Sequence, residues 1–328
     1  MKRVISLLLV VLMISSLLIS CDFLPDDIKT CKVNFYLDGE LISTQTVGRG
    51  KTVSAPNSPT KENQIFVGWF VDGLFTYEYD FSSKVLLDTD LHAYFTLDAI
   101  AVTNMITTSA MKGLVSIKNK SYNTSMGGLV ETTSSTSQGS GVVIEISNGF
   151  AYVLTNYHVV NQDEGYAKQK ISVFDPWGNE YVATVYKHPR LSNSAMDKSY
   201  DLALLYFQYT ETEEPLLNAI DMATKNPERG EYVVSLGAPR GQKNSITYGR
   251  ALAYQKLSAA EGESVADVVF DIILHNAIID HGSSGGPLLD PTGKLVGINF
   301  AGYESNNYGC AIPLSKIVEF LNKYVYVK

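Results

Sequence analysis

The sequence predicts a mainly β protein, and two observations lead to this class. After residue 114, short apolar stretches alternate with turn signals such as Asp175-Pro-Trp-Gly178, Asn226-Pro227 and Asp290-Pro-Thr-Gly293. Many short strands separated in this way are typical of an all-β barrel or sandwich. The one convincing amphipathic helix is the last element, in which one face at helical spacing carries Ile317, Val318, Phe320, Leu321 and Tyr324.

Length and charge narrow the classes of function. The 328 residues suffice for one large domain and one small one, and the formal net charge is −8. An acidic chain without basic blocks is poorly suited to binding a phosphate backbone, so nucleic acid is not expected as a partner.

The first twenty residues have the pattern of a secretion signal. Lys2 and Arg3 precede an apolar run from Val4 to Ile19, which predicts a signal peptide over residues 1–20. The end of this run, Leu18-Ile19-Ser20-Cys21, resembles a bacterial lipobox, which implies that Cys21 is lipidated and anchors the protein to the cell membrane. An uncleaved membrane anchor is the alternative, and either arrangement predicts an extracytoplasmic protein.

A polar tether over residues 21–30 is expected to precede a small β module over residues 31–97. Val33, Phe35 and Leu37 alternate with polar residues before the Asp38-Gly39 turn. The module resembles the Listeria–Bacteroides repeat, a small β-grasp-like domain of bacterial surface proteins, through Gly50-Lys51-Thr52-Val53, Pro56, Pro59, Phe66-Val67-Gly68-Trp69, Tyr79-Asp80-Phe81 and Asp90-Leu91. The resemblance implies an adhesion or spacer role. Trp69 and Phe66 are expected in the core, and His92 in a structural position.

The remaining chain is divided into a linker over residues 98–110, with some helical character, and a large domain over residues 111–328. Serine and threonine dominate residues 121–138, which predicts an exposed loop. Cys31 and Cys310 lie in different predicted domains and do not form a disulfide framework. Cys310 is expected to be a small buried apolar residue.

The stretch from Asp280 to Asp290 carries the strongest sign of chemistry. It places Ser284 in a tight turn that enters a buried strand, and Gly282 and Gly285 allow the backbone a positive φ. Such a turn directs successive N–H groups toward one point, as an oxyanion hole requires. A glycine-rich hairpin loop without function is the alternative reading of this stretch taken alone.

A serine nucleophile needs a histidine base and a carboxylate that orients it. His158 ends the apolar strand that begins at Leu154, at a rim position. Asp201 immediately precedes the apolar run Leu202-Ala203-Leu204-Leu205, where a charge is costly unless it has a partner. His158, Asp201 and Ser284 are therefore the candidate catalytic residues.

The order of these three residues and their flanking sequences resemble the chymotrypsin-like fold and, within it, the HtrA-type serine proteases. The matching runs are Gly139-Ser140-Gly141-Val142, Thr155-Asn156-Tyr157-His158-Val159-Val160, Asp201-Leu202-Ala203-Leu204-Leu205, Gly282-Ser283-Ser284-Gly285-Gly286-Pro287-Leu288, Gly297-Ile298-Asn299 and Ala311-Ile312-Pro313. The resemblance implies two six-stranded barrels with the active site between them. It makes Ser284 the nucleophile, His158 the general base and Asp201 the residue that orients His158. The backbone N–H groups of Gly282 and Ser284 would form the oxyanion hole.

Several residues depart from the family pattern. Ser283 stands where the family often has Asn; it cannot pair with a newly cut N-terminus, so no cleavage-activated zymogen is expected. His281 stands where the family often has Pro and is expected to face solvent. Tyr157 replaces a usually small residue and could crowd the contact between His158 and Asp201. Asp197, which competes with Asp201 for the carboxylate role, is expected to be a solvated loop residue.

The resemblance also places Ile278 and Asn299 at the primary specificity pocket, so an apolar residue is expected before the scissile bond of a protein or peptide substrate. No histidine–carboxylate cluster has the spacing of metal ligands, and neither a metal nor a cofactor is expected. The 44 residues after Ser284 (328 − 284) leave no room for the PDZ domain that HtrA proteins often carry. The rival reading is a surface binding protein, catalytically weak or inactive, in which the protease fold is a scaffold.

Overall fold

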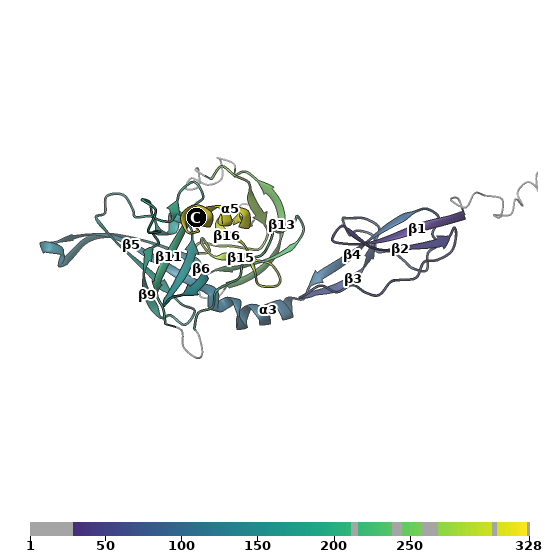
Figure 1. Ribbon diagram of the computed structural model, residues 1–328, viewed down its shortest axis with the longest axis horizontal. Helices are drawn as coiled ribbons and strands as arrows, with labels where there is room; N and C mark the ends of the chain where they lie inside the picture. The colour runs from purple at the N-terminus through teal and green to yellow at the C-terminus, as the bar shows by residue number, and fades with distance from the viewer. Residues whose placement is uncertain (1–28, 211–215, 238–244, 258–267, 304–306, 327–328) are drawn as a thin grey trace, which may run out of the picture. The chain divides into compact units, whose positions relative to one another are not determined.

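The computed structural model describes residues 29–210, 216–237, 245–257, 268–303 and 307–326. The expected signal peptide and Cys21 lie outside these residues. The chain forms two compact units, the first ending at Leu97 and the second beginning at Asp98. Both are built mainly from strands, which confirms the predicted class (Figure 1).

The first unit is a four-stranded sheet in the order β2-β1-β4-β3. Its central strands β1 and β4 are parallel, whereas the two outer pairings are antiparallel, so the sheet is mixed. No helix covers the sheet within residues 30–97. The strands are β1 (Thr30–Leu37), β2 (Glu40–Gly48), β3 (Gln64–Phe70) and β4 (Thr89–Leu97).

One face of this sheet forms the core of the first unit. Alternation in β1 buries Val33 and Phe35 completely, because successive side chains of a strand point to opposite faces. Trp69 is 2% exposed and packs edge-on against Phe35, and Phe66 packs against both this tryptophan and the same core. The expected core positions of Trp69 and Phe66 are confirmed.

The second unit begins with helix α3 (Ala99–Thr108) and the 3₁₀ helix η2 (Ala110–Gly113). Asp98 caps α3 by accepting a hydrogen bond from the N–H of Ala101. Val102 and Ile106 of this helix are fully buried. Residues 98–110, which the sequence predicts to be a connection, are therefore packed as part of the second unit.

The first barrel of this unit is a ring of six strands, β5-β6-β7-β11-β9-β8, that closes through the pairing of β9 with β11. The short strand β10 pairs with the other edge of β11. The strands are β5 (Leu114–Ser125), β6 (Val130–Ser147), β7 (Phe150–Thr155), β8 (Lys168–Phe174), β9 (Glu180–Val185), β10 (Met196–Asp197) and β11 (Leu202–Gln208). Its interior is filled with aliphatic side chains, among them Val115, Val153 and Leu205.

The second barrel is closed in the order β12-β13-β14-β17-β16-β15. Its strands are β12 (Tyr232–Gly237), β13 (Ser245–Gln255), β14 (Ile272–His275), β15 (Pro287–Leu289), β16 (Leu295–Tyr303) and β17 (Tyr308–Pro313). Helix α5 (Leu314–Tyr324) follows. The expected double β-barrel with a C-terminal helix is confirmed.

Three details differ from the sequence-based expectations or refine them. Residues 121–138 are largely exposed, although Ser121 is fully buried, and most of them form the outer half of the β5–β6 hairpin rather than a loop. Backbone pairing continues as far as Ser125 and Val130, because these side chains need no core to complete an antiparallel ladder. Helix α5 buries most of its predicted apolar face, whereas Val318 is 41% exposed. Cys31 and Cys310 are both buried and are not joined by a disulfide; the burial of Cys310 agrees with the prediction.

Within the described ranges, no helix combines the length and the apolar character needed to cross a membrane.

Candidate active site

His158 lies where a buried strand of the first barrel gives way to a single helical turn. β7 ends at Thr155, Asn156 is extended, and α4 (Tyr157–Val160) follows. Val159 and Val160 point into the barrel core. The His158 side chain consequently remains at the rim, with 30% of its surface exposed.

Asp201 meets His158 from the turn that leads into β11. Its Oδ1 accepts the backbone N–H of His158 at 3.0 Å, and its Oδ2 lies 2.8 Å from Nδ1 of the imidazole. A carboxylate can only accept, so Nδ1 carries the proton of this hydrogen bond. Nε2 of a neutral His158 is then left as an acceptor. Tyr157 does not prevent this contact.

The carboxylate of Asp201 is buried, and the backbone around it is fixed. The residue is 4% exposed and has a φ of 51°, in the left-handed region that few non-glycine residues adopt. Asn156 donates a hydrogen bond from its Nδ2 to the Asp201 carbonyl at 3.0 Å. Two elements of the first barrel therefore hold the histidine and the aspartate in one arrangement.

Ser284 lies in a turn between β14 and β15. The N–H of Ser283 donates to the Asp280 carbonyl at 2.9 Å, and Gly282 within this turn has a φ of 96°. Gly285 has a φ of 84°, and its N–H donates to the Asn299 carbonyl at 2.8 Å. Both positive φ values require glycine, as the sequence predicts.

The first barrel anchors this turn through Ser140 on β6. The Ser140 N–H donates to the Ser284 carbonyl and its Oγ to the Gly282 carbonyl, each at 2.7 Å. Thr155, at the end of β7, donates from its hydroxyl to the Ser140 carbonyl at 2.7 Å. A Cβ at Gly285 would collide with that carbonyl and that hydroxyl. The serine turn is thus connected, through Ser140, to Thr155 at the end of β7, the strand that precedes His158.

A second close approach brings the backbone of Ser284 beside the helical turn of the histidine. A Cβ at Gly139 would lie 2.7 Å from both γ-carbons of Val159 and 2.9 Å from the Ser284 carbonyl oxygen. Only glycine at position 139 therefore leaves room for Val159 and the Ser284 carbonyl to approach each other so closely. The sequence marks Gly139-Ser140-Gly141 as a motif but does not reveal this role.

The Ser284 hydroxyl makes its hydrogen bond to the Phe300 carbonyl, at a long distance of 3.4 Å. A bond of this length is weak, and catalytic hydrogen bonds are often long in a protein without substrate. The N–H groups of Gly282 and Ser284 have no acceptor among the residues that the structure describes. These two donors are the ones expected to form the oxyanion hole.

A buried polar network lies beneath the serine turn. Asn299 is fully buried; its Nδ2 donates to the Ser235 hydroxyl at 2.9 Å, and its Oδ1 is 3.1 Å from Nε2 of His275. Burial lowers the pKa of His275 to about 4, although hydrogen bonding to Asn299 opposes this shift. Asn299, expected at the specificity pocket, has its amide group within this network.

The other expected residues lie on the exposed side of the second barrel. Ile278 is 59% exposed, and its carbonyl accepts a hydrogen bond from the Thr247 hydroxyl at 2.8 Å. His281 is also exposed, and its backbone N–H donates to Oδ1 of Asp280 at 2.7 Å. Among the described residues, no three histidine, cysteine or acidic side chains gather as ligands for a metal ion.

Asp197 differs from the expected solvated loop residue. It lies on β10, its side chain is 14% exposed, and its carboxylate binds Lys323 and Tyr324 of α5. The partners come from the far end of the chain, so no local sequence signal could have found them.

Two protein families match this chain. Residues 139–298 match the trypsin-like peptidase domain, and residues 32–94 match the Listeria–Bacteroides repeat domain. Both resemblances drawn from the sequence motifs are thereby confirmed.

Curated relatives of the second unit are serine proteases. Mouse serine protease HTRA4 is 34% identical over 188 residues, which cover 57% of this chain and 34% of that protein. Serine protease Do-like HtrA of Bacillus subtilis is 29% identical over 237 residues, or 69% of this chain and 49% of that protein. The chain thus spans about half or less of the length of these relatives. The solved serine endoprotease of Yersinia pestis is 25% identical, with a TM-score of 0.46 over 68% of this chain and 65% of that one.

Proposed function

We propose, from the trypsin-like peptidase domain of residues 139–298 and the Listeria–Bacteroides repeat domain of residues 32–94, that this protein is a serine endopeptidase with a Ser284-His158-Asp201 triad. The observation that carries this proposal is the two-point contact of Asp201 with His158, at 3.0 Å and 2.8 Å. This contact leaves Nε2 as the base, and hydrogen bonds from Ser140 anchor the serine turn to the same barrel.

The reaction begins when the Ser284 hydroxyl turns from the Phe300 carbonyl toward Nε2 of His158. Its oxygen attacks the scissile carbonyl carbon while Nε2 takes the proton, and the buried Asp201 stabilises the resulting imidazolium. The oxyanion of the tetrahedral intermediate accepts hydrogen bonds from the N–H groups of Gly282 and Ser284. Preorganised donors of this kind contribute about 10²–10³-fold each.

The intermediate collapses when His158 returns the proton to the leaving amine, so the peptide C–N bond breaks and an ester to Ser284 remains. Water, deprotonated by the same imidazole, then attacks this ester and releases the acid product. All proton transfers pass through Nε2. These steps use no metal or cofactor. The proposed substrates are proteins or peptides.

The resemblance to the HtrA-type proteases puts Ile278 near the base of the primary specificity pocket, where an apolar side chain favours an apolar substrate residue before the scissile bond. We expect a preference for apolar residues there. Asp280 is close along the chain, and its charge opposes this apolar preference.

The signal pattern of residues 1–20 and the lipobox-like Cys21 support an extracytoplasmic, lipid-anchored location. An HtrA-type peptidase and a surface repeat domain are compatible with that location. The rival function is surface binding by the first unit with an inactive second unit, and the hydrogen bond of Ser284 to Phe300 is the observation that favours it.

Labelling with a fluorophosphonate probe tests the proposed function, because the probe reacts only with an activated serine. The wild type should be labelled, Ser284→Ala should not, and Ser283→Ala should still acquire the label. Ser283 is 5% exposed and its hydroxyl accepts a hydrogen bond from the Asp280 N–H, so it is the matched serine of the same turn. A folded wild type that resists labelling would favour the binding protein.

A further inference from the structure

The last turn of the C-terminal helix α5 contacts the chain immediately before Asp201. Oδ2 of Asp197 accepts hydrogen bonds from Nζ of Lys323 at 2.9 Å and from the Tyr324 hydroxyl at 2.6 Å. Its Oδ1 accepts the N–H and the hydroxyl of Ser199, at 2.9 Å and 2.6 Å. One carboxylate therefore joins α5 to the backbone of residues 197–200.

Tyr200 forms a second connection between the same segments. Its hydroxyl donates to Glu319 of α5, and its ring packs against Phe320 with 6.0 Å between the ring centroids. The Lys323 ammonium also lies 5.5 Å from the centre of the Tyr200 ring. Asp197 and Tyr200, on the two sides of the turn, are both bound to the helix.

The conformation of this turn determines where the Asp201 carboxylate points. The Tyr200 N–H donates to the Asp197 carbonyl at 3.3 Å, and the Asp201 N–H donates to the Lys198 carbonyl at 3.1 Å. Asp201 itself has the left-handed φ of 51°. A non-glycine residue keeps such a conformation only where the surrounding structure enforces it.

The hydrogen bonds to Asp197 also favour its ionised form. Partial burial by itself would raise the pKa of Asp197, but hydrogen bonds from Ser199, Tyr324 and Lys323 outweigh it and lower the pKa to about 2. The Asp197 carboxylate also raises the pKa of Lys323. The contact between Asp197 and Lys323 therefore joins two charged groups.

We propose that Asp197, Lys323 and Tyr324 are positioning residues, through which the C-terminal helix holds the turn that presents Asp201 to His158. This inference rests on the proposed function, since it assigns the helix a role in orienting the triad. The effect of these three residues passes through the backbone of residues 197–201 to the carboxylate of Asp201.

The test removes the helix side of the contact and leaves the turn residues in place. The double variant Lys323→Met, Tyr324→Phe should lower kcat by about 10- to 100-fold with little change in KM, because small misplacements of a catalytic group have effects of this size. Tyr324→Phe alone should cause a smaller loss, and Lys323→Arg should retain most of the rate. Circular dichroism at the assay temperature checks that each variant is folded.

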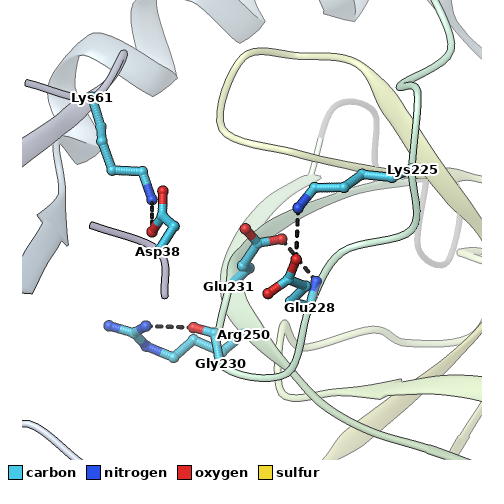
Figure 2. Close-up of polar contacts among 7 residues, drawn as sticks. All are labelled: Asp38, Lys61, Lys225, Glu228, Gly230, Glu231 and Arg250. Atoms are coloured by element: carbon cyan, nitrogen blue, oxygen red, sulfur yellow. Dashed lines mark hydrogen bonds and ion pairs between the residues drawn. The ribbon is translucent and has the colours of Figure 1, made fainter. Parts of the chain in front are cut away.

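The matched control is Lys225→Met, which breaks another ion pair of the second unit. Nζ of Lys225 lies 2.7 Å from Oε1 of Glu228, and both side chains are about two-thirds exposed (Figure 2). An exposed pair of this kind contributes little to stability. This variant should keep the wild-type kcat, so a loss common to both variants would contradict a specific role for α5.

A second readout does not depend on enzymatic activity. The Nδ1 proton of His158, held in the hydrogen bond to Asp201, should give a strongly deshielded NMR signal that exchanges slowly with water. In the double variant this signal should broaden or disappear, whereas it should persist in Lys225→Met. An unchanged signal overturns the positioning role. A wild type that shows the signal but resists the fluorophosphonate probe would instead refute the proposed function.

Discussion

Both carboxylate oxygens of Asp201 accept hydrogen bonds from His158, one from its backbone N–H at 3.0 Å and the other from Nδ1 at 2.8 Å. The first hydrogen bond fixes the position of the residue, and the second fixes the tautomer and the plane of the ring. A base oriented at two points loses little entropy when it takes a proton. This arrangement explains why a charged residue lies at the buried entrance of β11.

The substitution Asp201→Asn separates these two roles. The amide oxygen of the new side chain can still accept the His158 N–H, but its NH₂ group then faces Nδ1 and favours the tautomer with the proton on Nε2. We expect kcat on a peptide substrate to fall by about 10⁴-fold while the fold is retained. Asp271→Asn, at an exposed position of the second barrel, is the control. An Asp201→Asn enzyme within tenfold of wild type would contradict the assigned role.

The serine turn depends on the absence of a side chain at Gly285. In Gly285→Ala the new methyl group would collide with the Ser140 carbonyl and the Thr155 hydroxyl, at a φ of 84°. Crowding and backbone strain together should lower the free energy of unfolding by about 3 kcal/mol or more. Fluorophosphonate labelling should be lost as well.

Gly165→Ala is the matched control for this prediction, because Gly165 has the same φ of 84° and no atom within 4 Å of the added Cβ. Only the strain of the left-handed backbone applies, at about 1 kcal/mol. Urea unfolding of both variants measures the difference. Equal costs would mean that contact with the first barrel does not hold the serine turn.

The first unit has its own core, centred on the contact of Phe35 with Trp69 at 4.9 Å between ring centroids. Phe35→Ala should lower the free energy of unfolding of this unit by about 3–5 kcal/mol, since it leaves a cavity in a fully buried site. Trp177, the other tryptophan, is 54% exposed. In a Trp177→Phe background, Trp69 fluorescence therefore reports the unfolding of the first unit alone. Leu74→Ala, at a position 86% exposed, should change this energy by less than about 0.5 kcal/mol.

Sequence reasoning located the catalytic candidates because each one breaks a local pattern. Asp201 places a charge beside a buried run, His158 follows a strand end, and Ser284 lies among glycines that only a tight turn requires. Such conflicts between local pattern and function are visible without a structure. The mainly β class was predictable because the strands are short, apolar and bounded by turn residues, whereas the two barrels were implied by the resemblance to the chymotrypsin-like fold.

Two positions that sequence reasoning missed depend on partners far away in the chain. Asp197 looks like one acidic residue in a polar stretch, and only the approach of α5 makes it a half-buried ligand of Lys323. Ser140 belongs to a glycine-rich motif, and its bonds to Gly282 and Ser284 require the two barrels to meet. The hairpin of residues 121–138 was missed because polar strands lack the alternation that identifies half-buried ones.

The buried His275 should make the stability of the second unit depend on pH. Its pKa of about 4 in the folded protein is below the value of about 6.5 of an unfolded chain. Below pH 6.5 the unfolded state therefore binds a proton that the folded state does not, so stability falls as the pH decreases from 6.5 toward 4. Between pH 7 and pH 5 this histidine should remove about 2 kcal/mol.

The variant His275→Gln tests this prediction, because glutamine keeps an N–H donor for Asn299 but does not titrate. Urea unfolding at pH 7 and at pH 5, followed by near-ultraviolet circular dichroism, gives the two free energies. The difference between them should be smaller by about 2 kcal/mol in the variant than in the wild type. If the variant loses as much stability as the wild type on acidification, a group other than His275 binds the extra proton of the unfolded state. His275 would then be charged within the fold, beneath the turn that carries Ser284.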